Sequence, residues 1–176
     1  VPRPVQQEVR ILIRNAKAGP FTDDEVMERL EASTSAAAVA YERLLQAESR
    51  MDHDDVLRFG LQVTQVDGIA QLYAERYSYV LVDEAQDLTR VQYNLVEPIG
   101  RGRTVFAGDR AQGIYAFAGA DPVWVFDRIG ERSPIRVRLN KSYRSSPAVL
   151  AVVNAVAGAL GGEALTSANP DAWAGR

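Results

Sequence analysis

Two short apolar runs, each ending in acidic residues, constrain this chain more than any other feature of its sequence. The first run, at 79–82, reads Tyr-Val-Leu-Val and is followed by the Asp-Glu pair at 83–84. The second, at 104–107, reads Thr-Val-Phe-Ala and is followed by Gly-Asp at 108–109. Uninterrupted apolar runs of this length are typical of strands buried on both faces, as in a parallel sheet. Ligands of open α/β sheets bind at the carboxyl ends of such strands, so both acidic positions are candidate site residues.

Helical signals surround these runs. Thr22 and Glu25 have the spacing of a capping box, and Val26 and Leu30 follow at helical spacing. A third strand is predicted over 135–139, where aliphatic residues alternate with arginine. Further helices are expected over 35–50, from about 54, over 89–97 with a stop at Pro98 and Gly100, over 121–130 with Gly130 at its end, and from Ser146-Pro147 to 161–162.

Strands alternating with helices predict an α/β layered domain, and the helical first third predicts a separate or inserted subdomain. The segment 163–176 is rich in Ala, Gly, Asn and Pro, and is expected to be loose.

Composition excludes several classes of protein. The 176 residues suffice for one domain and part of another, and 47% are hydrophobic while 24% are charged. Cysteine is absent, which rules out disulfides and cysteine-ligated zinc. No apolar run reaches the length of a membrane span and no signal peptide opens the chain, so a cytoplasmic location without a membrane partner is expected. A first residue other than methionine suggests a fragment, a processed product or an engineered chain.

Charge is unevenly distributed along the chain. The net charge is −3, but residues 101–150 hold nine basic and four acidic side chains, a local excess of +5. Such an excess permits an anion-binding surface on an acidic protein, although a solvated charged surface is the plainer interpretation of charge alone.

The pair after the first strand suits nucleotide chemistry. Asp83 is a hard oxygen ligand for Mg²⁺, and Glu84 beside it can orient and deprotonate a water that attacks a γ-phosphate. This arrangement is that of a Walker B strand. A bare Asp-Glu pair is more often part of a surface turn or a helix cap. The neighbouring residues therefore determine whether this pair is interpreted as a nucleotide site.

Four segments resemble the motifs of UvrD/Rep-type superfamily-one helicases, in the family's order. Residues 79–87 are similar to the D-E-x-Q-D motif, and residues 107–120 to G-D-x-x-Q-x-I-Y-x-F/W-R-G-A. Residues 139–145 resemble L-x-x-N-Y-R-S, and residues 51–57 resemble the D-F-D-D-L-L segment that precedes the Asp-Glu strand. Ala118 departs from the family's arginine, which weakens an expected DNA or interdomain contact, and Ser142 replaces its asparagine.

The resemblance implies an ATP-dependent DNA helicase with roles for particular residues. Asp83 would bind the magnesium of MgATP, with Glu84 adjoining it as the catalytic base. Gln112 would sense the γ-phosphate, and Arg144 would act as an arginine finger, for which a planar, permanently charged guanidinium is well suited. By the same resemblance the residues around the nucleotide are Asp83, Gln86, Asp109, Gln112 and Arg144, with Asp87 near the motif junction.

Tyr115 and Phe117 are the candidate DNA contacts. Aromatics at these positions of the family stack on bases of single-stranded DNA, a sequence-tolerant contact. The alternative is core packing, which is also the interpretation adopted for Trp124, Phe126 and Trp173.

A metal site at 53–55 is discounted, because adjacent residues on a helix point in different directions. Asp52 is instead expected to cap a helix, and His53 to be a packing or surface residue.

No G-x-x-x-x-G-K-[ST] phosphate-binding loop occurs in the sequence. The resemblance implies that residues 1–50 end a helical insertion, that 51–132 form the second half of a first RecA-like motor domain, and that 133–176 open a second one. The chain alone is therefore expected to have negligible ATPase activity and to need the remaining helicase segments.

Two hypotheses follow. The first is a motor that hydrolyses ATP, translocates 3′ to 5′ on single-stranded DNA and acts at duplex junctions, with a nuclease or repair partner left open. The second is a non-catalytic, helicase-like module that binds DNA or a partner. The presence of Asp83, Glu84, Gln112 and Arg144 together favours the motor.

Overall fold

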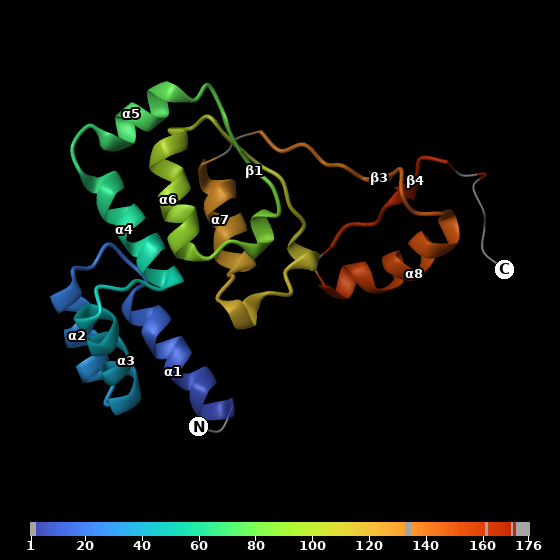
Figure 1. Ribbon diagram of the computed structural model, residues 1–176. Helices are drawn as coiled ribbons and strands as arrows, with labels where there is room; N and C mark the ends of the chain where they lie inside the picture. The colour runs from blue at the N-terminus through green and yellow to red at the C-terminus, as the bar shows by residue number, and fades with distance from the viewer. Residues whose placement is uncertain (1–2, 133–134, 161, 170, 172–176) are drawn as a thin grey trace. The chain divides into compact units, whose positions relative to one another are not determined.

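The computed structural model describes residues 3–132, 135–160, 162–169 and 171 (Figure 1). The chain divides into two compact units, residues 1–80 with 90–104 and residues 81–89 with 105–176. The helices are α1 (Arg3–Ala16), α2 (Asp23–Ala32), α3 (Ala36–Ala47), α4 (His53–Gln65), α5 (Ile69–Arg76), α6 (Arg90–Gly100), α7 (Pro122–Arg132) and α8 (Pro147–Ala157). The strands are β1 (Val80–Val82), β2 (Thr104–Phe106), β3 (Lys141–Ser142) and β4 (Thr166–Ser167). Short 3₁₀ turns are η1 (Ala85–Asp87), η2 (Arg110–Gln112), η3 (Ala116–Ala118) and η4 (Gly158–Leu160).

Side-chain caps fix the starts of several helices. At α2, Thr22 accepts a hydrogen bond from the Glu25 backbone N–H and the Glu25 carboxylate accepts from the Thr22 N–H, so the predicted capping box is confirmed. Asp52 caps α4 in the same reciprocal way with Asp55, which confirms the expected cap. Ser146 caps α8, with Pro147 in its first turn, also as predicted.

In the first unit, helices α1, α2 and α3 pack on one another around a small apolar core. Helices α4, α5 and α6 form a second mutually contacting group, as Figure 1 shows in green. A Cβ added to Gly60 of α4 would lie 3.3 Å from Leu95 Cδ1 of α6, so the absence of a side chain permits this close approach of the two helices. The buried core of the first group consists of Ile13, Ala16, Val26, Leu30 and Ala38.

A buried ionic cluster joins the end of α1 to α3 and α4. Lys17 is 1% exposed, and its Nζ lies 2.7 Å from Asp55 Oδ2, 2.8 Å from Glu42 Oε2 and 3.0 Å from Asp52 Oδ2. Burial by itself lowers the pKa of Lys17, but hydrogen bonds from its ammonium to the three carboxylates outweigh burial and raise the pKa to about 12. Lys17 is therefore a charged ammonium inside the unit.

Arg58 extends this cluster to the start of α2. Its guanidinium is buried, and Nη2 lies 2.8 Å from Asp55 Oδ1 and 2.7 Å from Asp23 Oδ1. Burial opposes ionisation of Asp55, but hydrogen bonds from Lys17, the Asp52 N–H and Arg58 lower the pKa of Asp55 below its ordinary value of 3.8. Arg58 Nη1 also donates to the Phe21 carbonyl oxygen at 2.6 Å. Asp55 thus holds α1, α2 and α4 together through two buried cations.

In the second unit, α7 packs on the turns η1 and η2, and Val125 of α7 is fully buried. The predicted strands at 79–82 and 104–107 are observed as β1 and β2, which pair in a two-stranded sheet. Their predicted burial on both faces is wrong, because Leu81 is 76% exposed and Val105 is 54% exposed. Lys141 and Ser142 of β3 pair in parallel register with Thr166 and Ser167 of β4. The expected α/β character is confirmed as helices combined with small parallel sheets. The formation of β4 also shows that the segment expected to be loose contains a strand.

Three other expectations are wrong. Residues 135–139 form no strand, and Ile135, Val137 and Leu139 are 83%, 77% and 85% exposed. No strand in the described residues pairs with this segment, so its alternating β-prone residues have no neighbouring strand with which to form a sheet. Helix α6 continues through Pro98 to Gly100, because a proline in the last turn removes only one of the helix's final hydrogen bonds. Helix α7 passes Gly130 and ends at Arg132.

Two further sequence-based expectations concern packing and membranes. Trp124 and Phe126 of α7 are half-buried, while Trp173 lies outside the described residues. Among the residues that the structure describes, no helix combines the length and apolar character needed to cross a membrane.

The ionic cluster makes a test of stability possible. We expect Lys17→Met to lower the free energy of unfolding by about 3–5 kcal/mol, because it leaves buried carboxylates without their cation. Denaturant titration followed by circular dichroism measures this loss. The control is Arg43→Met, which removes an exposed ion pair 2.9 Å from Glu31 and is expected to change stability by less than about 1 kcal/mol. Equal effects of the two substitutions would contradict a structural role for the buried cluster.

Candidate functional site

The carboxyl ends of β1 and β2 lie side by side. The backbone N–H of Ala107 donates to the Val82 carbonyl oxygen at 2.8 Å, and the Ala85 N–H donates to the Ala107 carbonyl oxygen at 2.9 Å. The hydrogen bonds continue past the last residue of each strand, and they bring the acidic residues that follow into one region. The two acidic positions that the sequence marks as candidate site residues therefore lie near each other.

Glu84 occupies an unusual backbone conformation. Its φ of 52° and ψ of 43° lie in the left-handed region, which costs a non-glycine residue about 1–2 kcal/mol. Asp83 Oδ1 accepts a hydrogen bond from the Glu84 N–H at 2.9 Å, and both side chains are exposed. The turn therefore presents two adjacent carboxylates to solvent at the end of β1.

Gln86 joins this turn to the end of β2. Its side chain is 2% exposed. The amide Nε2 donates to Glu84 Oε2 at 2.5 Å, and the amide Oε1 accepts from the Asp109 N–H at 3.0 Å. A single buried amide thus connects the predicted base to the backbone of the second motif.

Asp109 continues the connection to the predicted γ-phosphate sensor. Its Oδ1 accepts from the Ala111 N–H at 2.9 Å, and its Oδ2 accepts from Gln112 Nε2 at 2.9 Å. Glu84, Gln86, Asp109 and Gln112 therefore form one continuous series of contacts, which we call the strand-end chain. The structure brings these four predicted site residues together.

Gly108 belongs to the second motif, but sequence reasoning assigned it no role. A Cβ at this position would lie 2.6 Å from Gln86 Oε1, 3.0 Å from the Ala85 backbone N and 3.2 Å from Phe126 Cζ. No side chain fits there, so glycine is what allows the end of β2 to approach the Gln86 amide. The Gly-Asp pair in the sequence could have signalled this close approach.

Arg144 lies apart from the strand-end chain. It is exposed in the segment between β3 and α8, and among the described residues no hydrogen bond or ion pair links it to those four side chains. Its assignment as an arginine finger stays a prediction.

Tyr115 and Phe117 are both accessible. Phe117 is 74% exposed and Tyr115 is 45% exposed, and their ring centroids are 5.9 Å apart with a tilt of 49°. Core packing, the alternative considered from sequence, does not describe these exposed side chains. They form an aromatic surface that follows η2 along the chain.

The donor set after β1 fits Mg²⁺. Asp83 and Glu84 offer hard carboxylate oxygens, and Mg²⁺ is commonly held by one or two carboxylates together with waters and substrate phosphates. The described residues contain no cluster of three or more side chains that could hold a metal ion. Asp87 Oδ1 is also buried without a hydrogen-bond partner in this part of the chain, so a donor or a cation near it would be favourable.

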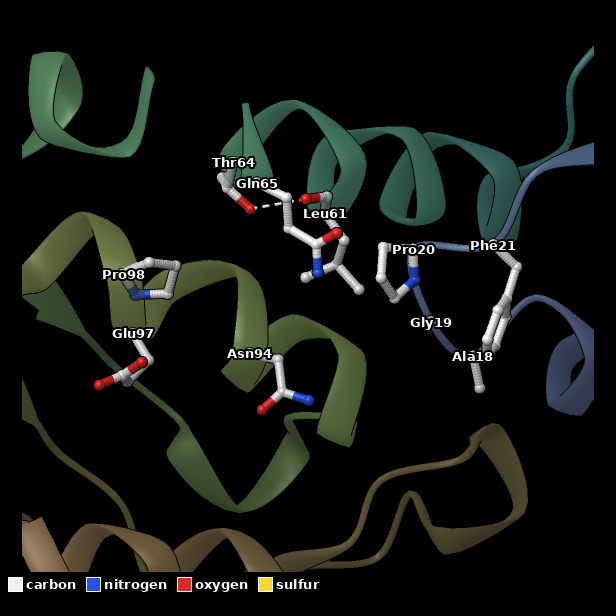
Figure 2. Close-up of a pocket in the computed structure, with 10 residues that line it drawn as sticks. All are labelled: Ala18, Gly19, Pro20, Phe21, Leu61, Thr64, Gln65, Asn94, Glu97 and Pro98. Atoms are coloured by element: carbon white, nitrogen blue, oxygen red, sulfur yellow. Dashed lines mark hydrogen bonds between the residues drawn. The ribbon is translucent and has the colours of Figure 1, made fainter. Parts of the chain in front are cut away.

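A separate pocket of about 460 Å³ lies in the first unit, between the segment 18–21 and helices α4 and α6. Figure 2 shows Phe21 and Pro20 on one side, Leu61 on α4, and Asn94 and Pro98 on α6. None of the predicted site residues lines it.

Comparison with known proteins identifies a family for this chain. The model of the UvrD/REP helicase N-terminal domain matches residues 3–128. The ATP-dependent DNA helicase UvrD1 of Mycobacterium tuberculosis is 36% identical over 152 residues, covering 80% of this chain and 19% of that protein. An ATP-dependent helicase/nuclease subunit of Alkaliphilus metalliredigens is 37% identical over 111 residues, covering 59% of this chain and 9% of that protein.

Parallel strands whose carboxyl ends gather acidic and amide side chains define a ligand-binding class of α/β protein. Within that class, the chain belongs to the UvrD/REP helicase family, as the match over residues 3–128 shows. It spans less than a fifth of the length of these two relatives.

Gly108 provides a test of the strand-end geometry. We expect Gly108→Ala to destabilise the protein by about 1–3 kcal/mol, because the added methyl group meets Gln86 Oε1 and the Ala85 backbone. Thermal unfolding measures the change. Gly130→Ala is the matched control: it lies within α7 with open space around the added Cβ, and is expected to stabilise by up to about 1 kcal/mol. A neutral Gly108→Ala would show that the two strand ends are not in close contact.

Proposed function

We propose that the full-length protein is an ATP-dependent DNA helicase that translocates 3′ to 5′ along single-stranded DNA and unwinds duplex at junctions. The observation that carries this proposal is the strand-end chain, which connects a candidate base, Glu84, to a candidate γ-phosphate sensor, Gln112. The relatives named ATP-dependent helicases support it. The proposed architecture is RecA-like, with residues 1–50 ending a helical insertion, 51–132 completing a first motor domain and 133–176 opening a second.

Glu84 is the proposed general base. Its carboxylate is exposed, so it can reach a water molecule, and its Oε2 is held by the Gln86 amide. A carboxylate that is both accessible and oriented can accept a proton from the water that attacks the γ-phosphate of ATP.

Asp83, with Glu84 adjoining, is the proposed magnesium position. Mg²⁺ bound there would neutralise charge on the phosphate oxygens of ATP. The Asp83 carboxylate is itself oriented by the hydrogen bond that it accepts from the Glu84 N–H.

Gln112 is the proposed γ-phosphate sensor, and Arg144 the proposed arginine finger. The Gln112 amide donates to Asp109, so a competing acceptor on a phosphate would alter a contact that leads back to Glu84. Arg144 is exposed, and its guanidinium can bind a phosphate oxygen pair bidentately. Segments beyond those in this chain supply the phosphate-binding loop in this proposal.

Tyr115 and Phe117 are the proposed contacts to single-stranded DNA. Two exposed rings 5.9 Å apart offer π faces to successive bases without reading their sequence. Their position in the chain, shortly after Gln112, gives the nucleotide and DNA sites a short covalent connection.

The decisive experiment on function is DNA-stimulated ATP hydrolysis by the full-length protein. We expect Glu84→Gln to lower turnover by at least about 100-fold, because the amide cannot accept the proton, while ATP and DNA binding persist. Steady-state hydrolysis with and without single-stranded DNA measures this effect. A wild-type protein that binds DNA but hydrolyses no ATP would instead identify a non-catalytic, helicase-like module.

Phe117 provides the corresponding test at the DNA surface. Phe117→Ala is expected to weaken binding of an oligothymidylate by about 1–3 kcal/mol through loss of one stacked base. Fluorescence anisotropy measures the affinity. Leu72→Ala, which truncates another exposed apolar side chain on α5, is the control and should leave the affinity unchanged. Equal affinities for wild type and Phe117→Ala would remove Phe117 from the DNA site.

A further inference from the structure

Gln86 is more deeply buried than any other member of the strand-end chain. It is 2% exposed, whereas Glu84 and Gln112 are exposed and Asp109 is half-buried. Its position within η1, against which α7 packs, explains the burial. A side chain this inaccessible is poorly placed to touch a nucleotide, although its position in the motif predicted a nucleotide contact.

Both ends of the Gln86 amide are in use, and in complementary ways. The NH₂ group donates to the Glu84 carboxylate at 2.5 Å, and the carbonyl oxygen accepts from the Asp109 N–H at 3.0 Å. An amide supplies a donor and an acceptor at these two points, whereas an ionised carboxylate supplies acceptors alone. A glutamate there would set a second carboxylate against Glu84, and an apolar residue would remove both hydrogen bonds.

We infer that Gln86 is a positioning residue that holds the Glu84 carboxylate in its working orientation and couples it to the loop that contains Gln112. This inference rests on the proposed function of Glu84 as the base. Gln86 acts through Glu84 and touches neither ATP nor the attacking water. The Asp109 carboxylate accepts a hydrogen bond from Gln112, and the Asp109 N–H donates one to Gln86. A shift of the loop that contains Gln112 therefore changes the orientation of the Gln86 amide and, through it, that of the Glu84 carboxylate.

This arrangement gives the sensor and the base a direct mechanical link of three hydrogen bonds. The close approach at Gly108 makes the link short, because a side chain there would occupy the position of Gln86 Oε1. The two hydrogen bonds of the Gln86 amide are partly buried, and the one between Gln112 and Asp109 is exposed. In such a series the orientation of each group depends on the next. Loss of Gln86 should therefore reduce turnover more than nucleotide binding.

The test uses Gln86→Met in the full-length protein, since methionine matches glutamine in length and fills the same space without hydrogen bonds. With saturating single-stranded DNA, we expect kcat for ATP hydrolysis to fall by about 10- to 100-fold, the usual effect of losing an outer-shell partner. KM for ATP should change by less than about threefold. Gln71→Met is the matched control, because Gln71 Nε2 donates to Glu75 Oε1 at 2.7 Å on the exposed face of α5; its kcat should equal that of wild type.

A double-variant comparison separates positioning from general damage. If Gln86 acts through Glu84, then adding Gln86→Met to Glu84→Gln should lower kcat no further than Glu84→Gln alone. Multiplicative losses would overturn the inference, as would a KM effect equal to or larger than the kcat effect. Gln86→Glu keeps the acceptor for the Asp109 N–H but places a second carboxylate against Glu84, so its kcat should fall at least as far as that of Gln86→Met. This second variant tests the inference if Gln86→Met folds poorly.

Amide hydrogen exchange tests the link without relying on activity. Gln86→Met should increase exchange of the Asp109 N–H relative to wild type, while Gln71→Met should not. A wild-type protein without ATPase activity would overturn the proposed function of Glu84 and with it the positioning role. Unchanged exchange at Asp109, in a wild type that does hydrolyse ATP, would overturn the coupling through Gln86 alone.

Discussion

The backbone hydrogen bonds between the ends of β1 and β2 are the constraint on which the candidate site depends. They extend beyond the strands, from Ala107 to Val82 and from Ala85 to Ala107. The Ala107 backbone donates one of these hydrogen bonds and accepts the other. Its position is therefore fixed, and this constrains the path of Gly108 and Asp109, which follow it. The Gln86 amide fills the space that Gly108 leaves, and the side chains of the site follow from that fit. The arrangement of the candidate site therefore depends on how closely the backbone after β1 approaches the backbone after β2.

Local signals in the sequence predicted much of this structure. Caps at Thr22, Asp52 and Ser146 involve residues three apart, and both strands end shortly before their acidic residues. The two acidic strand ends were also recognised from the sequence as one kind of feature, an apolar run followed by acids. Those predictions held because each rests on interactions within one element or between two adjacent parallel strands.

Interactions between distant residues were beyond the reach of the sequence. Lys17 and Asp55 are 38 positions apart, and nothing in either neighbourhood marks a buried ion pair. The segment 135–139 carries a strand pattern but has no partner in the described part of the chain, so its propensity is not expressed. Burial of Gln86 was likewise hidden, because its motif position indicated a residue that faces the ligand. A sequence pattern indicates the conformation that a segment prefers. Whether a strand pairs, or a side chain is buried, depends on which distant residues the fold places beside it.

The left-handed backbone of Glu84 has a consequence for how this sequence can change over time. At such φ and ψ values glycine and asparagine are favoured over glutamate, so selection for stability alone acts against the native residue. The fold and the chemistry therefore make opposite demands on one position. A descendant of this chain released from its catalytic duty is expected to lose Glu84 together with Gln86, because the buried Gln86 amide loses its acceptor when Glu84 is replaced.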